Sequence, residues 1–399
     1  MSRKVIVTGI GLVTAIGQDK ATTWENLLQG KSGIERSPIP DRIRARTNSK
    51  REQSGCLEIP AAWVDRKISA EPRAQRFMRQ AVKEAIADAG LDLPLPNCGV
   101  AIGSSRGCQR ELEQFNQFLK GNWQGEPPPW DSFLNLLPSA ISAAIASDLK
   151  TESAVLAPMA ACATANWAIA QAYELIQTGQ CDMAIAGTTD AAITELSIAG
   201  FQQLGVLAKT GAYPFSIERE GLVLGEGAAA LVLESSESAL KRGSRHCYGQ
   251  ILGFGLTNDA CHPTSPSDDY QAATQAVQSC LQRAGLSPQD VGYINAHGTA
   301  TKLNDAHEAE LIGRIFSDST YVSGTKGATG HALGATGMME AAFCLLALRD
   351  RLLPPCVGLQ TPAFDLNLIA SPKESPLETT LSFSFGFGGQ NAVVAFGRS

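Results

Sequence analysis

Apolar positions recur with a helical period in two segments of the chain that share one pattern. In residues 78–89 apolar side chains occupy positions i, i+4, i+7, i+8 and i+11, and residues 273–284 repeat this spacing. The spacing gives each helix one apolar stripe. Each segment ends at a glycine, Gly90 or Gly285, which suits a left-handed helix C-cap. We therefore predict two amphipathic helices at equivalent places in a repeated unit.

Strand-like runs flank both predicted helices in the same order. VIVTGIGL and CGVAIGSS flank the first helix, and QILGFGL and VGYINAHG flank the second. Two matching strand–helix–strand units predict an internal duplication with halves at residues 1–247 and 248–399. Alternating strands and helices are typical of mostly parallel sheets that helices cover on both faces. We expect a functional site where the two halves meet.

Composition narrows the class of protein. Of the 399 residues 44% are hydrophobic and 18% are charged, which is enough apolar surface to offset chain entropy and excludes disorder. The net charge of −6 argues against nucleic acid as the main partner. No run of about 18 apolar residues predicts a membrane span. The first residues favour a strand over a signal peptide.

Cys162 is the main candidate for a nucleophile. The chain has 10 cysteines and no C-x-x-C pair, which argues against a disulfide framework or a zinc knuckle and favours a reduced, cytoplasmic protein. The apolar run SAVLAP leads into Cys162, and an amphipathic helix follows at once. A helix N-terminus supplies partial positive charge that favours a thiolate. A buried structural cysteine is the competing interpretation.

Two of the five histidines follow strand-like runs in glycine-rich turns. They are His297 in NAHGTAT and His331 in KGATGH, and Lys326 and Glu340 flank the second. Parallel α/β sheets bind ligands at the carboxyl ends of their strands. The spacing H-x-x-x-H or H-E-x-x-H is missing, so we expect no metal. A cluster of acidic residues and His307 at 305–308 reads as a solvated helix face.

A third motif lies near the C-terminus. Phe383, Phe385 and Phe387 alternate before the run GGQN, which ends at Asn391. Glycines allow backbone N–H groups to approach a ligand closely, and aromatic rings can gate an apolar channel. The run AVVAFG that follows is strand-like rather than helical, which excludes a dinucleotide-binding turn.

These motifs resemble, in order along the chain, the β-ketoacyl-acyl carrier protein synthases of the elongating type II class. Those proteins are condensing enzymes of the thiolase superfamily. The four matching motifs are ACATA, NAHGTAT, KGATGH and FGFGGQN, and the resemblance covers nearly the whole chain. It implies an α/β thiolase-like fold in which two duplicated halves form a five-layered αβαβα sandwich.

The resemblance also implies a reaction and a set of roles. Cys162 would hold an acyl group as a thioester, and malonyl-acyl carrier protein would lose CO2 and attack it, as in fatty acid elongation. His297 and His331 would hydrogen-bond the malonyl thioester carbonyl. Lys326 would be a further catalytic residue and, with Glu340, would orient and polarise the His331 side. The remaining implied roles are an oxyanion hole and gate at Cys162, Phe385 and Phe387, support from Glu340 and Asn391, pantetheine contacts at Thr299 and Thr301, and an acyl pocket at Arg106, Phe201 and Phe387. No metal or redox cofactor is implied, because the carrier's phosphopantetheine brings the substrate.

The implied partners are an acyl carrier protein and a second copy of the chain. A carrier of this class is acidic, as this chain is, so docking requires a local basic patch. Arg73, Arg76 and Arg79 recur at i, i+3 and i+6 along one predicted helix. A solvated helix face explains them equally well.

Departures from the family pattern concern the acyl substrate. Arg106 stands where the family has small and aliphatic residues lining the acyl channel, and an unpaired buried cation there would disfavour long saturated chains. The other departures are Trp167, Ser216, Glu220, Phe383, Gln390 and a shortened loop before Pro214. A ketosynthase for a polyketide or an unusual lipid is therefore an alternative.

Three further alternatives are less favoured. A non-catalytic partner of the chain-length-factor type usually lacks the nucleophile, whereas Cys162 is present. A degradative thiolase needs a cysteine in the C-terminal glycine-rich turn at 384–391, which has none. Initiating enzymes use Cys, His and Asn, which the segment from Lys326 to His331 contradicts.

Overall fold

The computed structural model describes residues 3–399 except 39–57, 68–70, 123–129, 245 and 268. The N-terminal half forms a path of five hydrogen-bonded strands. Their order is β1 (Val5–Val13), β7 (Leu224–Ser235), β6 (Met183–Ala191), β4 (Cys98–Gly103) and β5 (Val155–Leu156). The pairs β1–β7 and β7–β6 are antiparallel, and the pairs β6–β4 and β4–β5 are parallel.

The C-terminal half repeats this path strand for strand. Its order is β8 (Gly249–Asn258), β15 (Gln390–Gly397), β14 (Thr379–Gly386), β9 (Tyr293–Asn295) and β10 (Tyr321–Ser323). Again two antiparallel pairs are followed by two parallel pairs. The two paths join where β1 pairs with β8 over two residue pairs. The shared order and directions confirm the duplication. The expectation of mostly parallel sheets is wrong, because each half has two antiparallel and two parallel pairs. The tight reversal between β14 and β15 requires antiparallel pairing, whereas β1 and β7 are antiparallel partners far apart in the sequence.

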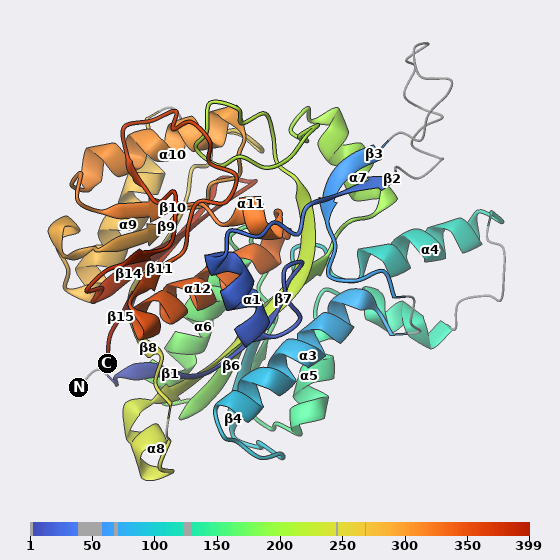
Figure 1. The fold of residues 1–399 in the computed structure, drawn as a ribbon. Coiled ribbons are helices and arrows are strands. Elements are labelled where there is room, and N and C mark those ends of the chain that lie inside the picture. The colour runs from blue at the N-terminus through green and yellow to red at the C-terminus, as the bar shows by residue number, and fades with distance from the viewer. Residues whose placement is uncertain (1–2, 39–57, 68–70, 123–129, 245, 268) are drawn as a thin grey trace.

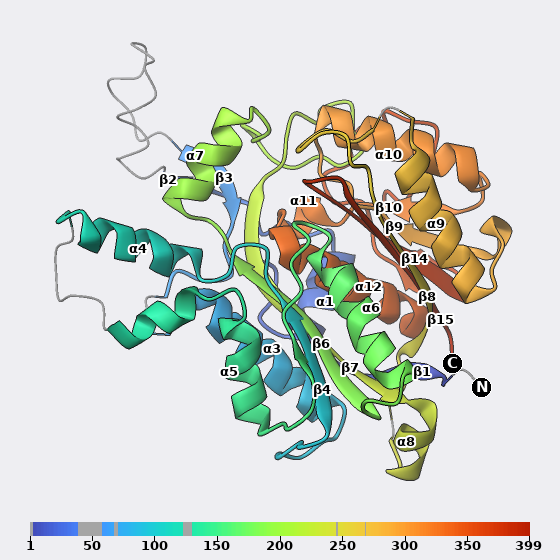
Figure 2. The same cartoon turned by 180° about the vertical axis from the view of Figure 1, so that it is seen from behind.

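Helices form three layers around the two strand paths (Figures 1 and 2). α3 (Arg73–Asp88) and α5 (Ala140–Leu149) cover the outer face of the first path, and α9 (Gln271–Ala284) and α10 (Lys302–Ile315) cover that of the second. Between the paths lie α6 (Thr164–Gln177) and α12 (Thr336–Asp350). This arrangement is the expected five-layered αβαβα sandwich.

Shorter elements connect these layers. They are α1 (Lys20–Leu28), β2 (Glu35–Pro38), β3 (Glu58–Ala62), α4 (Gln109–Leu119), η1 (Trp130–Leu136), α7 (Glu195–Gln203), α8 (Ser236–Lys241), η2 (Pro288–Asp290), α11 (Lys326–Thr329), η3 (Leu333–Ala335), β11 (Leu352–Leu353), β12 (Asn367–Leu368) and β13 (Lys373–Glu374). Among the described residues no helix combines the length and apolar character that crossing a bilayer requires.

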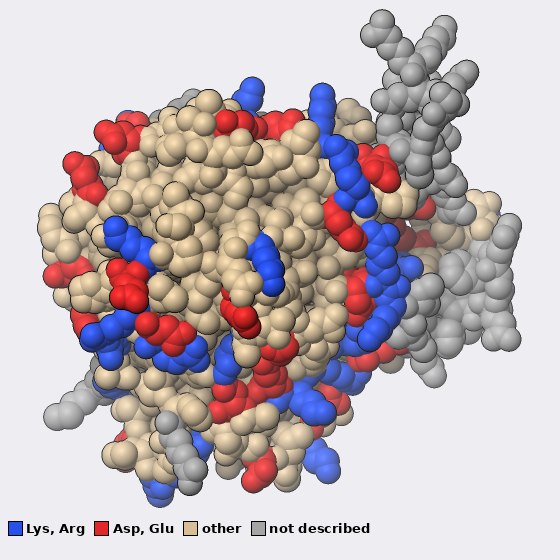
Figure 3. All heavy atoms as spheres, in the orientation of Figure 1, with Lys and Arg blue, Asp and Glu red and all other residues tan. Residues whose placement is uncertain are grey.

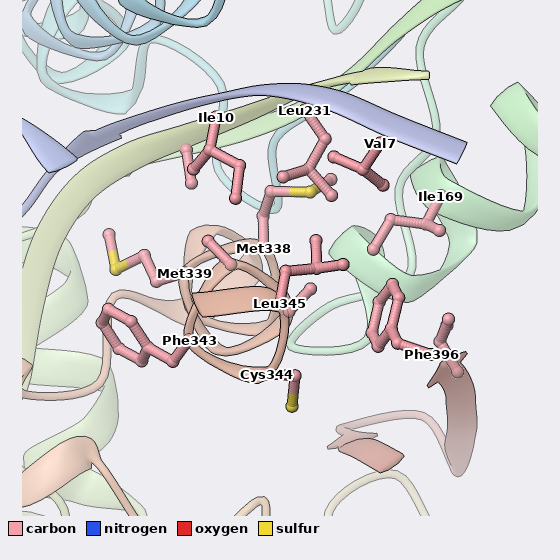
Figure 4. Close-up of a cluster of buried hydrophobic side chains, with 14 of the residues drawn as sticks. Val7, Ile10, Ile169, Leu231, Met338, Met339, Phe343, Cys344, Leu345 and Phe396 are labelled. Atoms are coloured by element: carbon pink, nitrogen blue, oxygen red, sulfur yellow. The ribbon is translucent and has the colours of Figure 1, made fainter. Parts of the chain in front are cut away.

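The central helix α12 organises the largest core. Every residue from Thr336 to Leu348 is buried, as expected of a helix that is apolar on nearly all sides. Figure 4 shows Met338 directed toward Ile10 of β1 and Leu231 of β7. The helix also contacts β14, β15 and β9 of the second half. It therefore packs against strands of both halves, and it holds the site described below in place.

Glycines in equivalent strands let the outer helices approach closely. A Cβ atom on Gly11 would lie 1.9 Å from the carbonyl oxygen of Ala81 in α3. In the second half a Cβ atom on Gly255 would lie 1.8 Å from the carbonyl oxygen of Ala276 in α9. Both distances are too short for any side chain, so the duplication preserves one packing contact in each half.

We expect Gly11→Ala to lower the free energy of unfolding by about 1–3 kcal/mol, because the added methyl group would overlap the α3 backbone. The measurement is urea denaturation followed by circular dichroism. Gly313→Ala is the matched control, since nothing lies within 4 Å of the corresponding Cβ in α10. Equal stability of the two variants would contradict this account of the packing.

Candidate active site

Cys162 lies on a strained turn directly before α6. Ala161 has a φ angle of 49°, in the left-handed region that residues other than glycine rarely adopt. Small side chains surround the turn, and a Cβ atom on Gly386 would lie 3.0 Å from the backbone nitrogen of Cys162. The turn therefore brings the β14–β15 connection against the backbone of Cys162.

The Cys162 thiol is protonated at rest. Burial raises its pKa to about 11, although the charges of Lys326 and Arg106 and a hydrogen bond from the Phe387 backbone act in the opposite direction. Loss of hydration outweighs these opposing charges and the hydrogen bond. The expected contribution of the helix N-terminus stays a prediction.

Both predicted histidines lie beside Cys162. His297 follows β9, and His331 follows the turn at Gly330. Their ring centroids are 5.4 Å apart with the ring planes at 82°. The ligand-type atoms of Cys162, His297 and His331 all lie within 4.8 Å of one another. The N-terminal half thus supplies the sulfur and the C-terminal half supplies both imidazoles.

Lys326 and Glu340 form a buried ion pair next to His297. Lys326 Nζ lies 2.6 Å from Glu340 Oε1 and 3.4 Å from His297 Nδ1, and it also donates to the His297 carbonyl oxygen. Each of the paired side chains is only 1% exposed. Burial raises the pKa of Glu340 to about 7, and the positive charge of Lys326 opposes this rise. The hydrogen bond from Lys326 holds the backbone carbonyl group of His297 in place.

Both imidazoles are neutral. Burial lowers the pKa of His297 and of His331 well below the usual value, and the charge of Lys326 lowers both further. Nδ1 of His297 faces Lys326, and Nδ1 of His331 lies 3.1 Å from Thr336 Oγ1. In each ring Nε2 is therefore the nitrogen that faces a substrate as a hydrogen-bond donor. A neutral imidazole N–H can stabilise a developing oxyanion.

The same three residues form a potential metal-binding group by distance alone. Their environment opposes a cation, because the Lys326 ammonium lies 3.4 Å from Nδ1 of His297. The high pKa of the Cys162 thiol also makes a thiolate ligand costly.

Two acidic residues that sequence reasoning assigned to a solvated face are instead fully buried. Glu308 accepts the backbone N–H groups of His297 at 2.6 Å and Gly298 at 2.7 Å. Asp305 accepts the N–H groups of Phe215 at 2.8 Å and Ala300 at 3.1 Å. Burial raises the pKa values of Glu308 to about 8 and Asp305 to about 6. Their position in the first two turns of α10, directly after the HGTAT motif, was the signal that could have identified them as supports of His297.

An open cavity of about 860 Å³ connects these groups to the surface. Both halves line it. The lining includes Cys162, Phe201, Val206, Leu222, His297, Thr299, Thr301, His331, Phe385, Phe387 and Asn391. The structure thus brings together most of the residues that the sequence singled out. Thr299 and Thr301 lie near the start of α10, with their hydroxyl oxygens 2.9 Å apart.

The aromatic residues of the C-terminal motif border the cavity on two sides. The Phe385 ring lies 6.0 Å from that of His297, and the Phe387 ring lies 6.2 Å from that of Phe201. Gly388 and Gly389 have φ angles of 82° and 75°, which allow the tight reversal after Phe387. Asn391 supports this reversal, since it donates to Asp259 at 2.6 Å and to the Gly389 carbonyl oxygen at 3.3 Å.

Arg106 lies at the outer side of the Phe201 wall. Its guanidinium carbon is 5.6 Å from the centre of the Phe201 ring, and the residue is exposed. Arg106 is therefore not a buried cation within the cavity. The expected energetic penalty against long saturated acyl chains does not arise. Its charge still reaches the reacting sulfur, because it lowers the pKa of Cys162 against the larger effect of burial.

The arginines suggested for carrier docking are held by carboxylates. Arg73 is only 6% exposed and forms ion pairs with Asp65 and Glu226. Arg76 pairs with Asp65 at 2.9 Å. Figure 3 shows basic and acidic side chains interspersed over the face in that view. The burial of Arg73 argues against its contact with a carrier, whereas docking at Arg76 stays a prediction.

Comparison with known proteins agrees with the site geometry. The family description "Beta-ketoacyl synthase, N-terminal domain" matches residues 2–239, and "Beta-ketoacyl synthase, C-terminal domain" matches residues 248–360. The chain belongs to the β-ketoacyl synthase family. The resemblance inferred from the four motifs is thereby confirmed.

Individual β-ketoacyl synthases match over the whole chain. The 3-oxoacyl-[acyl-carrier-protein] synthase 2 of Staphylococcus aureus (strain COL) is 36% identical over 412 residues, covering 99% of this chain and 98% of that protein. The protein of the same name from Synechocystis sp. is 35% identical over 413 residues, with 99% and 98% coverage.

Solved structures show the same fold. A β-ketoacyl synthase from Burkholderia phymatum STM815 superposes with a TM-score of 0.87 at 28% identity, covering 100% of both chains. A ketosynthase chain solved with a type II polyketide acyl-carrier protein superposes with a TM-score of 0.89 at 28% identity, with the same coverage. These neighbours confirm the thiolase-like fold expected from the sequence.

We expect alkylation of Cys162 by iodoacetamide to accelerate steadily from pH 6 to pH 9, by about tenfold per pH unit, because only the thiolate reacts and the pKa of the thiol is about 11. Mass spectrometry of the peptide that contains residue 162 measures the rate, with Cys162→Ala as control. A rate that reaches a plateau near pH 7 would contradict a protonated resting thiol.

Proposed function

We propose that this β-ketoacyl synthase catalyses the decarboxylative condensation of malonyl-acyl carrier protein with an acyl group held on Cys162. The observation that supports this most directly is the convergence of Cys162, His297 and His331 on one cavity. The relatives named 3-oxoacyl-[acyl-carrier-protein] synthase 2 favour fatty acid elongation over a polyketide pathway. The complete set of reactive residues also disfavours a non-catalytic partner.

In the first half-reaction the Cys162 sulfur attacks the carbonyl of an acyl thioester. The carrier thiol leaves and takes up the proton lost by Cys162, and the acyl group stays on the enzyme. We infer that the backbone N–H groups of Cys162 and Phe387 stabilise the tetrahedral oxyanion, and the hydrogen bond from the Phe387 backbone to the sulfur supports this role.

In the second half-reaction malonyl-acyl carrier protein enters the same cavity. His297 and His331 donate from Nε2 to its thioester carbonyl oxygen, which becomes negative when the carboxylate leaves as CO2. The resulting carbanion attacks the acyl carbonyl and the bond to sulfur breaks. The Cys162 thiolate that leaves then takes up a proton from solvent, which regenerates the thiol. Thr299 and Thr301 would hydrogen-bond the pantetheine arm near the cavity mouth. These steps need neither a metal nor a redox cofactor.

The acyl carrier protein is the proposed small partner. One structural neighbour is a ketosynthase solved in complex with its acyl-carrier protein, at 28% identity to this chain. The described cysteines are all free thiols, and a free thiol at position 162 is needed for catalysis. We therefore place the protein in the reducing cytoplasm.

Acylation of Cys162 is the decisive test of this function. Incubation with acyl carrier proteins loaded with chains of several lengths should add one acyl mass to the intact protein, as measured by mass spectrometry. Cys162→Ala should remove the increment entirely. No increment with any donor would overturn the proposed function.

A second copy of the chain is the other proposed partner. α4 projects from the body of the molecule in Figures 1 and 2. Its Leu119 is 69% exposed, and Leu134 of the neighbouring η1 is 61% exposed. On the same half, the edge strand β5 ends near Met159, which is 56% exposed. Exposed apolar side chains and a strand at the edge of a sheet are each typical of surfaces that a symmetric partner covers.

We expect sedimentation to give about twice the 42.1 kDa chain mass for the wild-type protein. The double variant Leu119→Asp/Leu134→Asp should shift the protein to the monomer, because each charge would be buried in the interface. Leu240→Asp in α8 is the control, since Leu240 is 82% exposed outside this surface. A monomeric wild-type protein would contradict the proposed dimer.

A further inference from the structure

Asp190 is a buried carboxylate for which the condensation chemistry above has no role. It lies near the end of β6 and is 0% exposed. Within the described part of the chain, no Lys, Arg or His forms an ion pair with it. Its charge is instead balanced by N–H and O–H donors, which is the usual requirement for a buried acid without a counter-ion.

The donors come from two separate turns. Oδ1 accepts from Ser104 Oγ at 2.7 Å and from the Arg106 N–H at 3.0 Å. Oδ2 accepts from the N–H and the Oγ of Ser105 at 3.1 and 2.8 Å, and from the Gly334 N–H at 2.8 Å. One carboxylate therefore joins the turn that follows β4 to the η3 turn.

The first turn belongs to the acyl side of the cavity. The Asp190 contact fixes the backbone of Arg106, whose guanidinium lies over the Phe201 ring. Phe201 in turn packs against Phe387, which contacts the sulfur of Cys162 through its backbone. A shift of this turn would move the aromatic wall along which an acyl chain extends.

The second turn belongs to the malonyl side. Gly334 lies three residues after His331, and the η3 turn leads to Thr336, whose hydroxyl lies 3.1 Å from His331 Nδ1. A Cβ atom on Gly334 would lie 2.9 Å from Asp190 Oδ2, so the approach requires a glycine. Leu333 of the same turn packs in one apolar cluster with Phe201. The two turns thus meet at Asp190 and at Phe201.

We propose that Asp190 is a positioning residue that couples the acyl wall at Arg106 and Phe201 to the turn that orients His331. The inference rests on the proposed function. Its consequence is that one side chain outside the cavity lining sets two properties together, the preference for acyl chain length and the rate of malonyl decarboxylation.

Asp190→Asn tests this coupling because the side chain keeps its size but one oxygen becomes an amide group that cannot accept hydrogen bonds. We expect at least a tenfold slower release of CO2 from malonyl-acyl carrier protein, together with a flatter dependence of Cys162 acylation on chain length. Both rates are normalised to the folded fraction measured by thermal denaturation.

Asp88→Asn is the matched control. Asp88 is also an inward-facing carboxylate that accepts a backbone N–H, that of Ile10 at 2.9 Å, and the Tyr248 hydroxyl, but it pairs with Lys20 and lies in the outer helix α3. This variant should lose stability and keep both the decarboxylation rate and the chain-length profile. If Asp190→Asn behaves like Asp88→Asn, Asp190 is only structural and the inference is overturned.

A second pair of variants covers the case in which Asp190→Asn does not fold. Ser105→Ala removes one donor to Oδ2, and Ser142→Ala, at a buried hydroxyl in α5, is its control. Ser105→Ala should change the two rates together and by less than Asp190→Asn. Rates equal to those of the control would overturn the coupling. A wild-type protein that neither acylates nor decarboxylates would instead overturn the proposed function.

Discussion

The buried ion pair between Lys326 and Glu340 is the interaction on which the site depends. Lys326 fixes the carbonyl oxygen of His297, and its charge adds to burial in lowering the pKa of both imidazoles, which keeps them neutral. Glu340 lies in α12, the helix packed between the two strand paths. Removing either partner would leave an uncompensated charge in the core, which typically costs about 3–5 kcal/mol. The Lys326–Glu340 ion pair therefore contributes both to the charge environment of the histidines and to the packing of the core.

The duplication explains why the reactive groups meet. Cys162 lies just before the first turn of α6, and His331 lies just before η3 and the first turn of α12. These two helices occupy equivalent places in the two halves and lie side by side between the strand paths. The residues that precede these two equivalent helices therefore line the same cavity. The halves then differ in chemistry, with a thiol in the first and an imidazole in the second.

The sequence predicted what is encoded locally and missed what depends on tertiary contacts. Helix periodicity and glycine-rich turns located Cys162, His297 and His331 because each follows a short-range pattern. The antiparallel strands were missed, since pairing direction depends on distant partners. The burial of Glu308 and Arg73 was missed for the same reason, because a charged residue on an amphipathic helix looks solvated until its buried partners are known.

The junction between the halves has a mechanical consequence. β1 and β8 join the two strand paths into one sheet, and α6 and α12 fill the space between them. Within the described part of the chain, strand pairing and helix packing thus tie the two halves together. We expect the two substrates to exchange through small movements at the cavity wall, where Phe387 and its two following glycines lie. We therefore expect the residues of the cavity wall to rearrange between the two half-reactions while the two halves keep their arrangement.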